Sequence, residues 1–95
     1  MSTLLLSHNQ LASLSPDIGH MARSLEELDL THNQLDALPT ELAKLTRLRV
    51  LAVEENAIVE LPAQLGSLTQ LERLAVGTQS RRLRYVLGLL YSMDV

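Results

Sequence analysis

The chain contains no cysteine, no phenylalanine and no tryptophan among its 95 residues. Without cysteine it can form neither a disulfide bond nor a thiol nucleophile, and this absence favours a reducing compartment, so we expect a cytoplasmic protein. Without phenylalanine and tryptophan, the core must be built from leucine, isoleucine, valine and alanine. Side chains of so few shapes suit an array of similar layers, each packed on the next.

Other features are missing as well. The N-terminus has neither the basic region nor the apolar run of a signal peptide, and the longest apolar-rich stretch, Tyr85–Tyr91, is far shorter than the about 20 residues of a transmembrane helix. The net charge of −3 argues against nucleic-acid binding, which needs a basic face. No glycine-rich phosphate loop and no nucleophile with a partnered base is present, so we expect no cofactor and no enzymatic activity.

Leucines and one asparagine recur with a fixed period. Within residues 25–47 leucine stands at 25, 28, 30, 35, 38, 42 and 45 and asparagine at 33, and the same frame returns 23 residues later. A period of this length predicts a repeat protein. The predicted repeats span residues 1–24, 25–47 and 48–70, with a partial repeat at 71–79 and a separate segment at 80–95.

Each repeat divides into two parts. The last four positions of the L-x-x-L-x-L part alternate apolar and other residues, which predicts a strand. Parallel strands need a crossover connection, and the L-P-x-x-L-x-x-L part predicts a short helix or 3₁₀ turn that begins at proline. We therefore predict an α/β fold, a short right-handed solenoid with a parallel β-sheet on the concave face and short helical or 3₁₀ connections on the convex face.

Three asparagines follow the strands at the same phase of the repeat. We expect Asn9, Asn33 and Asn56 to form a structural column in which each side chain bonds backbone groups of neighbouring turns.

The two ends of the array differ. Residues 80–95 carry apolar side chains at the spacing of one helix face, and we interpret them as a helix that caps the last layer. At the other end, the apolar strand around residues 3–6 is expected to be an open edge. Three interpretations stay open: a fragment or short form of a longer array, self-association through this N-terminal edge strand, or an edge that is tolerated.

The repeat L-x-x-L-x-L-x-x-N-x-L-x-x-L-P-x-x-L-x-x-L, which residues 25–45 follow, resembles the 23-residue class of intracellular leucine-rich repeats. This class includes Ras-suppressor and Ras-scaffold proteins and the repeats of many signalling and cell-polarity scaffolds. The resemblance covers roughly residues 1–79. It implies a non-catalytic adaptor or scaffold that binds other proteins on the concave strand face.

The strand residues between the leucines are expected to face outward on that concave side. Carboxylates gather there on two neighbouring strands, among small apolar side chains. We predict that this face binds a protein partner with a basic or mixed segment, the alternative being a solvated face without a partner. The predicted binding residues are Glu27, Asp29, Thr31, His32, Val50, Ala52, Glu54, Glu55 and Arg73.

Two other functions stay open beside the interaction module. The chain could be a short isoform or fragment with a structural role only. It could instead be a regulatory part of a larger enzyme complex.

Three further motifs have weaker interpretations. His8 and His32 share a column with Glu55 and could hold a metal or form a pH-sensitive contact, although surface histidines recur in this slot without ligands and we predict no metal. Residues 93–95 could add a strand to a PDZ-type groove. The basic residues before the last apolar segment could touch an anionic membrane, but we prefer a structural cap; they are Arg81, Arg82 and Arg84.

Overall fold

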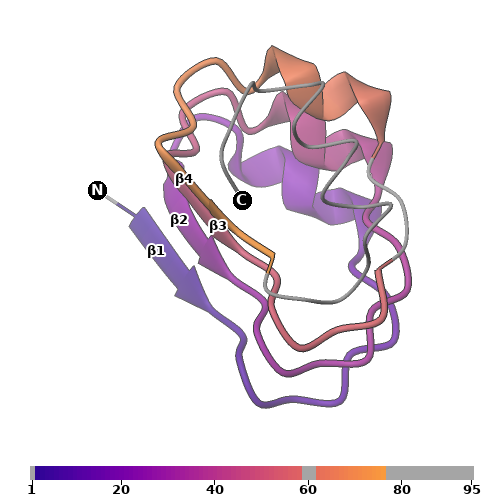
Figure 1. Ribbon diagram of the computed structural model, residues 1–95. Helices are drawn as coiled ribbons and strands as arrows, with labels where there is room; N and C mark the ends of the chain where they lie inside the picture. Colours follow the sequence, from indigo (N-terminus) through magenta and orange to yellow (C-terminus); the bar gives the residue numbers. More distant parts are fainter. Residues whose placement is uncertain (1, 59–61, 77–95) are drawn as a thin grey trace.

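The protein folds as a stack of layers in which strands and 3₁₀-helices alternate along the chain (Figure 1). The computed structural model describes residues 2–58 and 62–76. The strands are β1 (Ser2–Leu5), β2 (Leu25–Asp29), β3 (Val50–Ala52) and β4 (Arg73–Ala75). The 3₁₀-helices are η1 (Pro16–Met21), η2 (Thr40–Lys44) and η3 (Ala63–Ser67).

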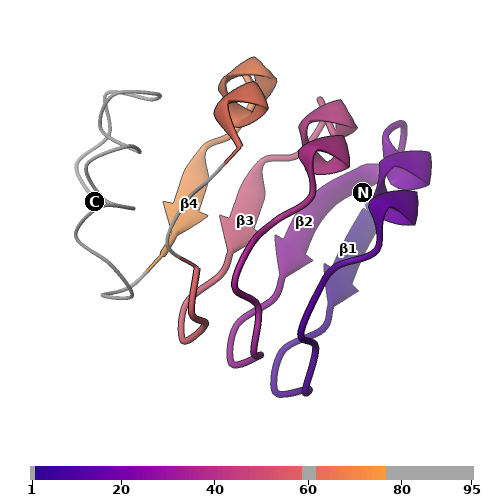
Figure 2. The same cartoon turned by 90° about the vertical axis from the view of Figure 1, so that its right-hand side faces the viewer.

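The four strands form one parallel sheet in chain order, β1-β2-β3-β4. Figure 2 shows the strands side by side, with the helices stacked in the same order. Each neighbouring pair of strands is joined by a crossover that contains a 3₁₀-helix, as parallel pairing requires. This arrangement confirms the predicted α/β solenoid with a parallel sheet and short helical connections.

Leucines at equivalent repeat positions lie next to one another in the core. Leu28 pairs with Leu4 on one side and with Leu51 on the other, and Leu51 pairs with Leu74. Because successive strand residues point to opposite faces, the side chains between these leucines face outward. Burying a leucine side chain contributes about 1.5–3 kcal/mol, so the repeated leucines are the main source of stability.

Proline begins each connection. Pro16 is the first residue of η1, where the hydroxyl of Ser15 accepts a hydrogen bond from the backbone N–H of Asp17 at 3.1 Å. Pro39 and Pro62 stand immediately before η2 and η3. Proline suits these positions because its φ angle is fixed and a helix start has no use for its missing N–H.

Asn33 connects the backbone of two repeats. Its Nδ2 donates to the carbonyl oxygens of Leu6 and Leu30, at 2.9 and 3.0 Å. Its Oδ1 accepts the backbone N–H of Leu11 at 3.2 Å. Leu6 and Leu11 belong to the first predicted repeat and Leu30 to the second, so one buried amide holds both together.

Asn56 and Asn9 form hydrogen bonds with different parts of the chain. Asn56 makes the same set of bonds one repeat later, to the carbonyl oxygens of Leu30 and Val53 and from the N–H of Leu35. Asn9 is exposed and donates to carbonyl oxygens of its own turn.

The residues just before the asparagines lie in turns. His8, His32 and Glu55 have φ angles of 58°, 57° and 56°, in the left-handed region. This region is uncommon for residues other than glycine, although histidine is among those that tolerate it. The repeat frame predicts outward strand positions for His32 and Glu55, whereas the structure places all three residues beyond the ends of β1, β2 and β3.

Several of the sequence predictions fall outside the described residues. These are the capping helix at 80–95, the end of the partial repeat at 77–79, the arginine group and the C-terminal residues 93–95. The repeat boundaries also stay predictions.

Candidate partner-binding face

Outward side chains form two rows that run across the sheet. The strand register aligns the first row as Thr3, Glu27, Val50 and Arg73 and the second as Leu5, Asp29, Ala52 and Ala75. Because neighbouring strands lie about 4.8 Å apart, adjacent members of a row can touch. The hydroxyl of Thr3, for example, donates to the carboxylate of Glu27 at 3.5 Å.

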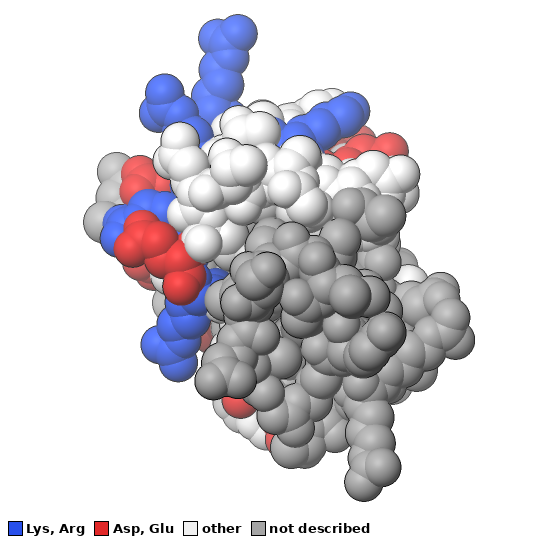
Figure 3. Space-filling model, turned by 45° about the horizontal axis from the view of Figure 1, so that its top comes forward, with Lys and Arg blue, Asp and Glu red and all other residues white. Residues whose placement is uncertain are grey.

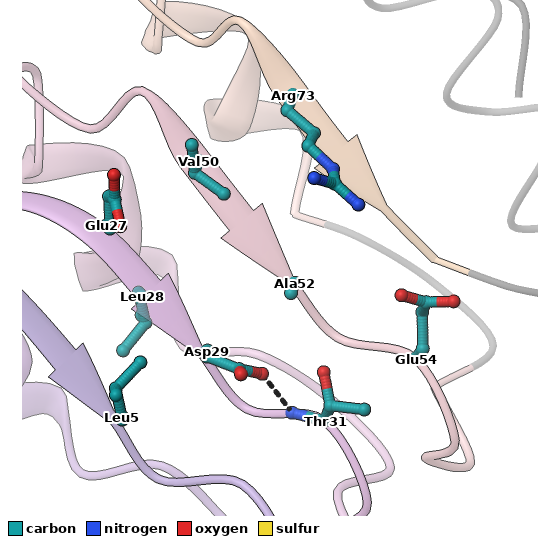
Figure 4. A pocket seen from close by; sticks show the side chains of 9 residues that line it. All are labelled: Leu5, Glu27, Leu28, Asp29, Thr31, Val50, Ala52, Glu54 and Arg73. Atoms are coloured by element: carbon teal, nitrogen blue, oxygen red, sulfur yellow. Dashed lines mark hydrogen bonds between the residues drawn. The ribbon is translucent and has the colours of Figure 1, made fainter.

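A shallow hollow of about 270 Å³ opens on this face. We call it the concave hollow, and its lining residues are Leu5, Glu27, Leu28, Asp29, Thr31, Val50, Ala52, Glu54 and Arg73 (Figure 4). The structure therefore brings together seven of the nine predicted binding residues. The other two, His32 and Glu55, lie in the turns and do not line it.

Charges of both signs line the concave hollow. Glu27 and Asp29 come from β2, Glu54 follows β3, and Arg73 begins β4. Figure 4 shows Val50 and Ala52 between these charged side chains. Within residues 2–58 and 62–76, neither the carboxylate of Glu54 nor the guanidinium of Arg73 has an ion-pair partner, so both can interact with a bound molecule.

Asp29 is held by the turn that follows β2. Its Oδ1 accepts the backbone N–H of Thr31 at 3.0 Å, the dashed line in Figure 4. Hydrogen bonding by the Thr31 hydroxyl and then by this N–H lowers the pKa of Asp29. Burial opposes these bonds with a smaller effect, and the nearby charges of His8 and His32 add still smaller lowering effects. Asp29 is therefore a carboxylate fixed in position and favoured in its ionised form.

His8 and His32 stack on each other beside this carboxylate. Their ring centroids lie 4.4 Å apart with an angle of 14° between the ring planes. Both side chains are exposed. Within the part of the chain that the structure describes, no group of three or more histidine, cysteine, aspartate or glutamate side chains is placed to hold a metal ion.

A ladder of charged side chains crosses the sheet at the start of the strands. Arg49 Nη1 lies 3.7 Å from Oε1 of Glu26, and Arg49 Nε donates to the carboxylate of Glu72. We call these three residues the charge ladder. Figure 3 shows acidic and basic side chains in contact on this side of the molecule. This ladder is not among the sequence predictions, although Glu26, Arg49 and Glu72 recur at the 23-residue period with alternating sign.

None of the helices in the described ranges has the length and apolar character needed to span a bilayer.

Known proteins resemble this chain in both sequence and fold. The leucine rich repeat family model matches residues 1–58 and again residues 23–77. A leucine-rich repeat and calponin homology domain-containing protein of Drosophila melanogaster is 38% identical over 59 residues, which are 62% of this chain and 7% of that protein. The structure of an LRR protein of Leptospira interrogans matches with a TM-score of 0.85 at 28% identity, covering 97% of this chain and 24% of that one.

The chain belongs to the leucine-rich repeat family. Leucine-rich repeat proteins generally mediate protein–protein interactions and are generally not enzymes. The chain spans less than a quarter of the length of either matched protein.

Proposed function

We propose that this chain is a non-catalytic interaction module, an adaptor or scaffold that binds a partner protein on its concave face. The observation that supports this best is the concave hollow, where carboxylates of β2 and of the segment after β3 surround the small apolar side chains of Val50 and Ala52. Complementary charge would select a partner with a basic or mixed segment and speed its association.

The rigidity of this face also favours binding. The strands are fixed by pairing on the sheet, and Asp29 is fixed by Thr31. A surface that is already ordered loses little conformational entropy when a partner binds, which leaves more of the contact energy for affinity.

The wider biological role stays a prediction from the sequence. We propose, from the sequence alone, that the protein is cytoplasmic and that it takes part in signalling. A non-catalytic role agrees with the general behaviour of the family.

The test compares two double variants in a pull-down. Glu27→Lys with Glu54→Lys reverses charge in the concave hollow, and Asp17→Lys with Asp36→Lys makes the same charge change at exposed residues that do not line it. We expect the first variant to lose proteins that wild type and the second variant both recover. Equal recovery by all three, with unchanged circular dichroism spectra, would remove the proposal.

A further inference from the structure

The charges of the concave hollow have a fixed order across the sheet. Along one row, from β2 to β4, the side chains are the carboxylate of Glu27, the apolar Val50 and the guanidinium of Arg73. Asp29 adds negative charge on β2 and Glu54 adds it just after β3, while Arg73 is the only described β4 residue in the lining. A purely basic partner would meet repulsion at Arg73, so this order favours a partner that carries both signs.

The distance between the negative and the positive side chains favours one backbone conformation of the partner. Glu27 and Arg73 stand two strands apart, which is about 10 Å at the backbone. In an α-helix, residues seven apart lie on one face and are separated by about 10.5 Å. In an extended segment, residues on one side are separated by about 6.7 or 13 Å, and neither value fits as well.

An exposed apolar side chain lies at the β1 side of the same face. Leu5 is 69% exposed, and it is the one large hydrophobic side chain that is exposed among the described residues. It neighbours Asp29 in the second row. A helix residue one turn from the basic side chain, about 5–6 Å away, would reach it.

We propose that the partner presents an α-helix that lies across the strands of the concave face. A lysine or arginine of this helix contacts the carboxylates of Glu27 and Asp29 on β2. An aspartate or glutamate seven residues away contacts Arg73, and an apolar residue one turn to the other side covers Leu5. This inference rests on the proposed function and specifies the partner for it.

The test uses a phage-displayed library in which one helix face of a three-helix bundle is randomised. We expect clones selected on the wild-type chain to carry opposite charges about two helical turns apart. Binding of these clones should fall about tenfold or more on Glu27→Lys and on Arg73→Glu, which each lose one charge-assisted contact. The double variant should recover part of that loss, because a helix bound in the opposite direction then matches the reversed charges.

Arg47→Glu is the matched control, since it makes the same charge change as Arg73→Glu at an exposed residue that does not line the concave hollow. It should leave binding unchanged, and Arg73→Gln provides a milder variant if Arg73→Glu fails to fold. Clones that lose binding on Glu27→Lys but carry no opposite charges at this spacing would overturn the inference and leave the proposed function intact. A library whose binders ignore every substitution in the hollow would overturn both.

Discussion

At the scale of single residues, Asn33 shows how a polar side chain can sit inside a core of leucines. Asn33 is only 8% exposed. Its side-chain nitrogen donates to the carbonyl oxygens of Leu6 and Leu30, and its side-chain oxygen accepts the backbone N–H of Leu11. No buried side-chain nitrogen or oxygen of the described residues lacks a partner. The amide is tolerated in the core because its nitrogen and its oxygen both have backbone partners.

Asn33→Ala should therefore destabilise the protein much more than Asn9→Ala. The first substitution leaves backbone groups of two repeats unsatisfied in the core, and we expect a loss of about 2–3 kcal/mol in the free energy of unfolding. Asn9 occupies the same repeat position but is exposed, so its loss should stay below about 1 kcal/mol. Urea unfolding measures both, and equal losses would show that burial does not set the strength of these bonds.

Asp29 predicts a pH dependence of stability. Its pKa is lowered in the folded protein by the Thr31 hydrogen bonds and the nearby histidine charges. A group with a lowered folded pKa stabilises the fold above its unfolded pKa, and this contribution is lost as the pH falls through the folded pKa. We expect wild type to be more stable than Asp29→Asn at pH 7 and the difference to shrink below about pH 4.

Urea midpoints at pH 7, 5 and 3 provide the measurement for Asp29. Asparagine keeps an acceptor for the Thr31 N–H, so the comparison isolates the charge. A stability difference that grows on acidification would contradict the assignment.

Some single-residue features could be predicted from the sequence and others could not. The phase of the asparagines relative to the leucines marks Asn33 and Asn56, whose side chains bond the preceding repeat, but it does not show that Asn9 bonds carbonyl oxygens of its own turn instead of a neighbouring one. The left-handed turns were not visible, because His8, His32 and Glu55 are not the glycine or asparagine that normally marks such a backbone. The repeat frame places His8 and His32 in one column, but it does not predict that their rings stack.

At the scale of elements, each strand ends one residue before the alternation of its repeat does. In the third repeat the alternation indicates a strand over residues 50–53, and β3 spans Val50–Ala52. Pairing continues on both sides through single backbone bonds, from the N–H of Arg49 to Glu26 and from the N–H of Val53 to Ala75. Periodicity predicts which face a residue takes, but it does not contain the backbone geometry that ends a regular ladder.

The charge ladder links β2, β3 and β4 through side chains at the surface. Arg49→Glu should lower the urea midpoint, because it places three carboxylates in a row, and Glu72→Arg in the same chain should restore part of the loss. The pKa of Glu72 is lowered by its hydrogen bond to Arg49 and then by the charge of Arg49, which agrees with a formed pair. The effect should weaken at 1 M salt, where charges are screened within about 3 Å.

Arg47→Glu is again the control for this measurement. Arg47 lies beside the charge ladder, and its replacement by glutamate changes the net charge by the same amount as Arg49→Glu. If Arg47→Glu and Arg49→Glu lower the midpoint equally, the loss reflects net charge and the ladder has no specific role.

At the scale of the whole molecule, burial is uneven along the stack. The described core residues of the second and third repeats are almost fully buried. In the first repeat Ile18 is buried, but the other core residues are only partly buried, namely Leu4, Leu6, Leu11, Leu14 and Met21. Among the described residues, β1 pairs with β2 alone. Self-association through this edge strand, one of the three interpretations that the sequence leaves open, stays a prediction.

Thr3→Lys tests that prediction. A charge on an edge strand opposes pairing with a second copy, and Glu27 beside it can pair with the new lysine, so folding should be retained. We expect light scattering to show a mass that rises with concentration for wild type and stays monomeric for Thr3→Lys. Thr46→Lys adds the same charge in a turn away from the edge and should behave as wild type. A wild-type chain of constant monomer mass would contradict the prediction.

The bonds that Asn33 makes to the first repeat and those that Asn56 makes to the second are the same set, atom for atom. A gene that encodes residues 25–47 twice in succession would therefore supply both junctions with the groups they need. The product would be a taller stack with one more strand, and a designer could choose its length by counting copies.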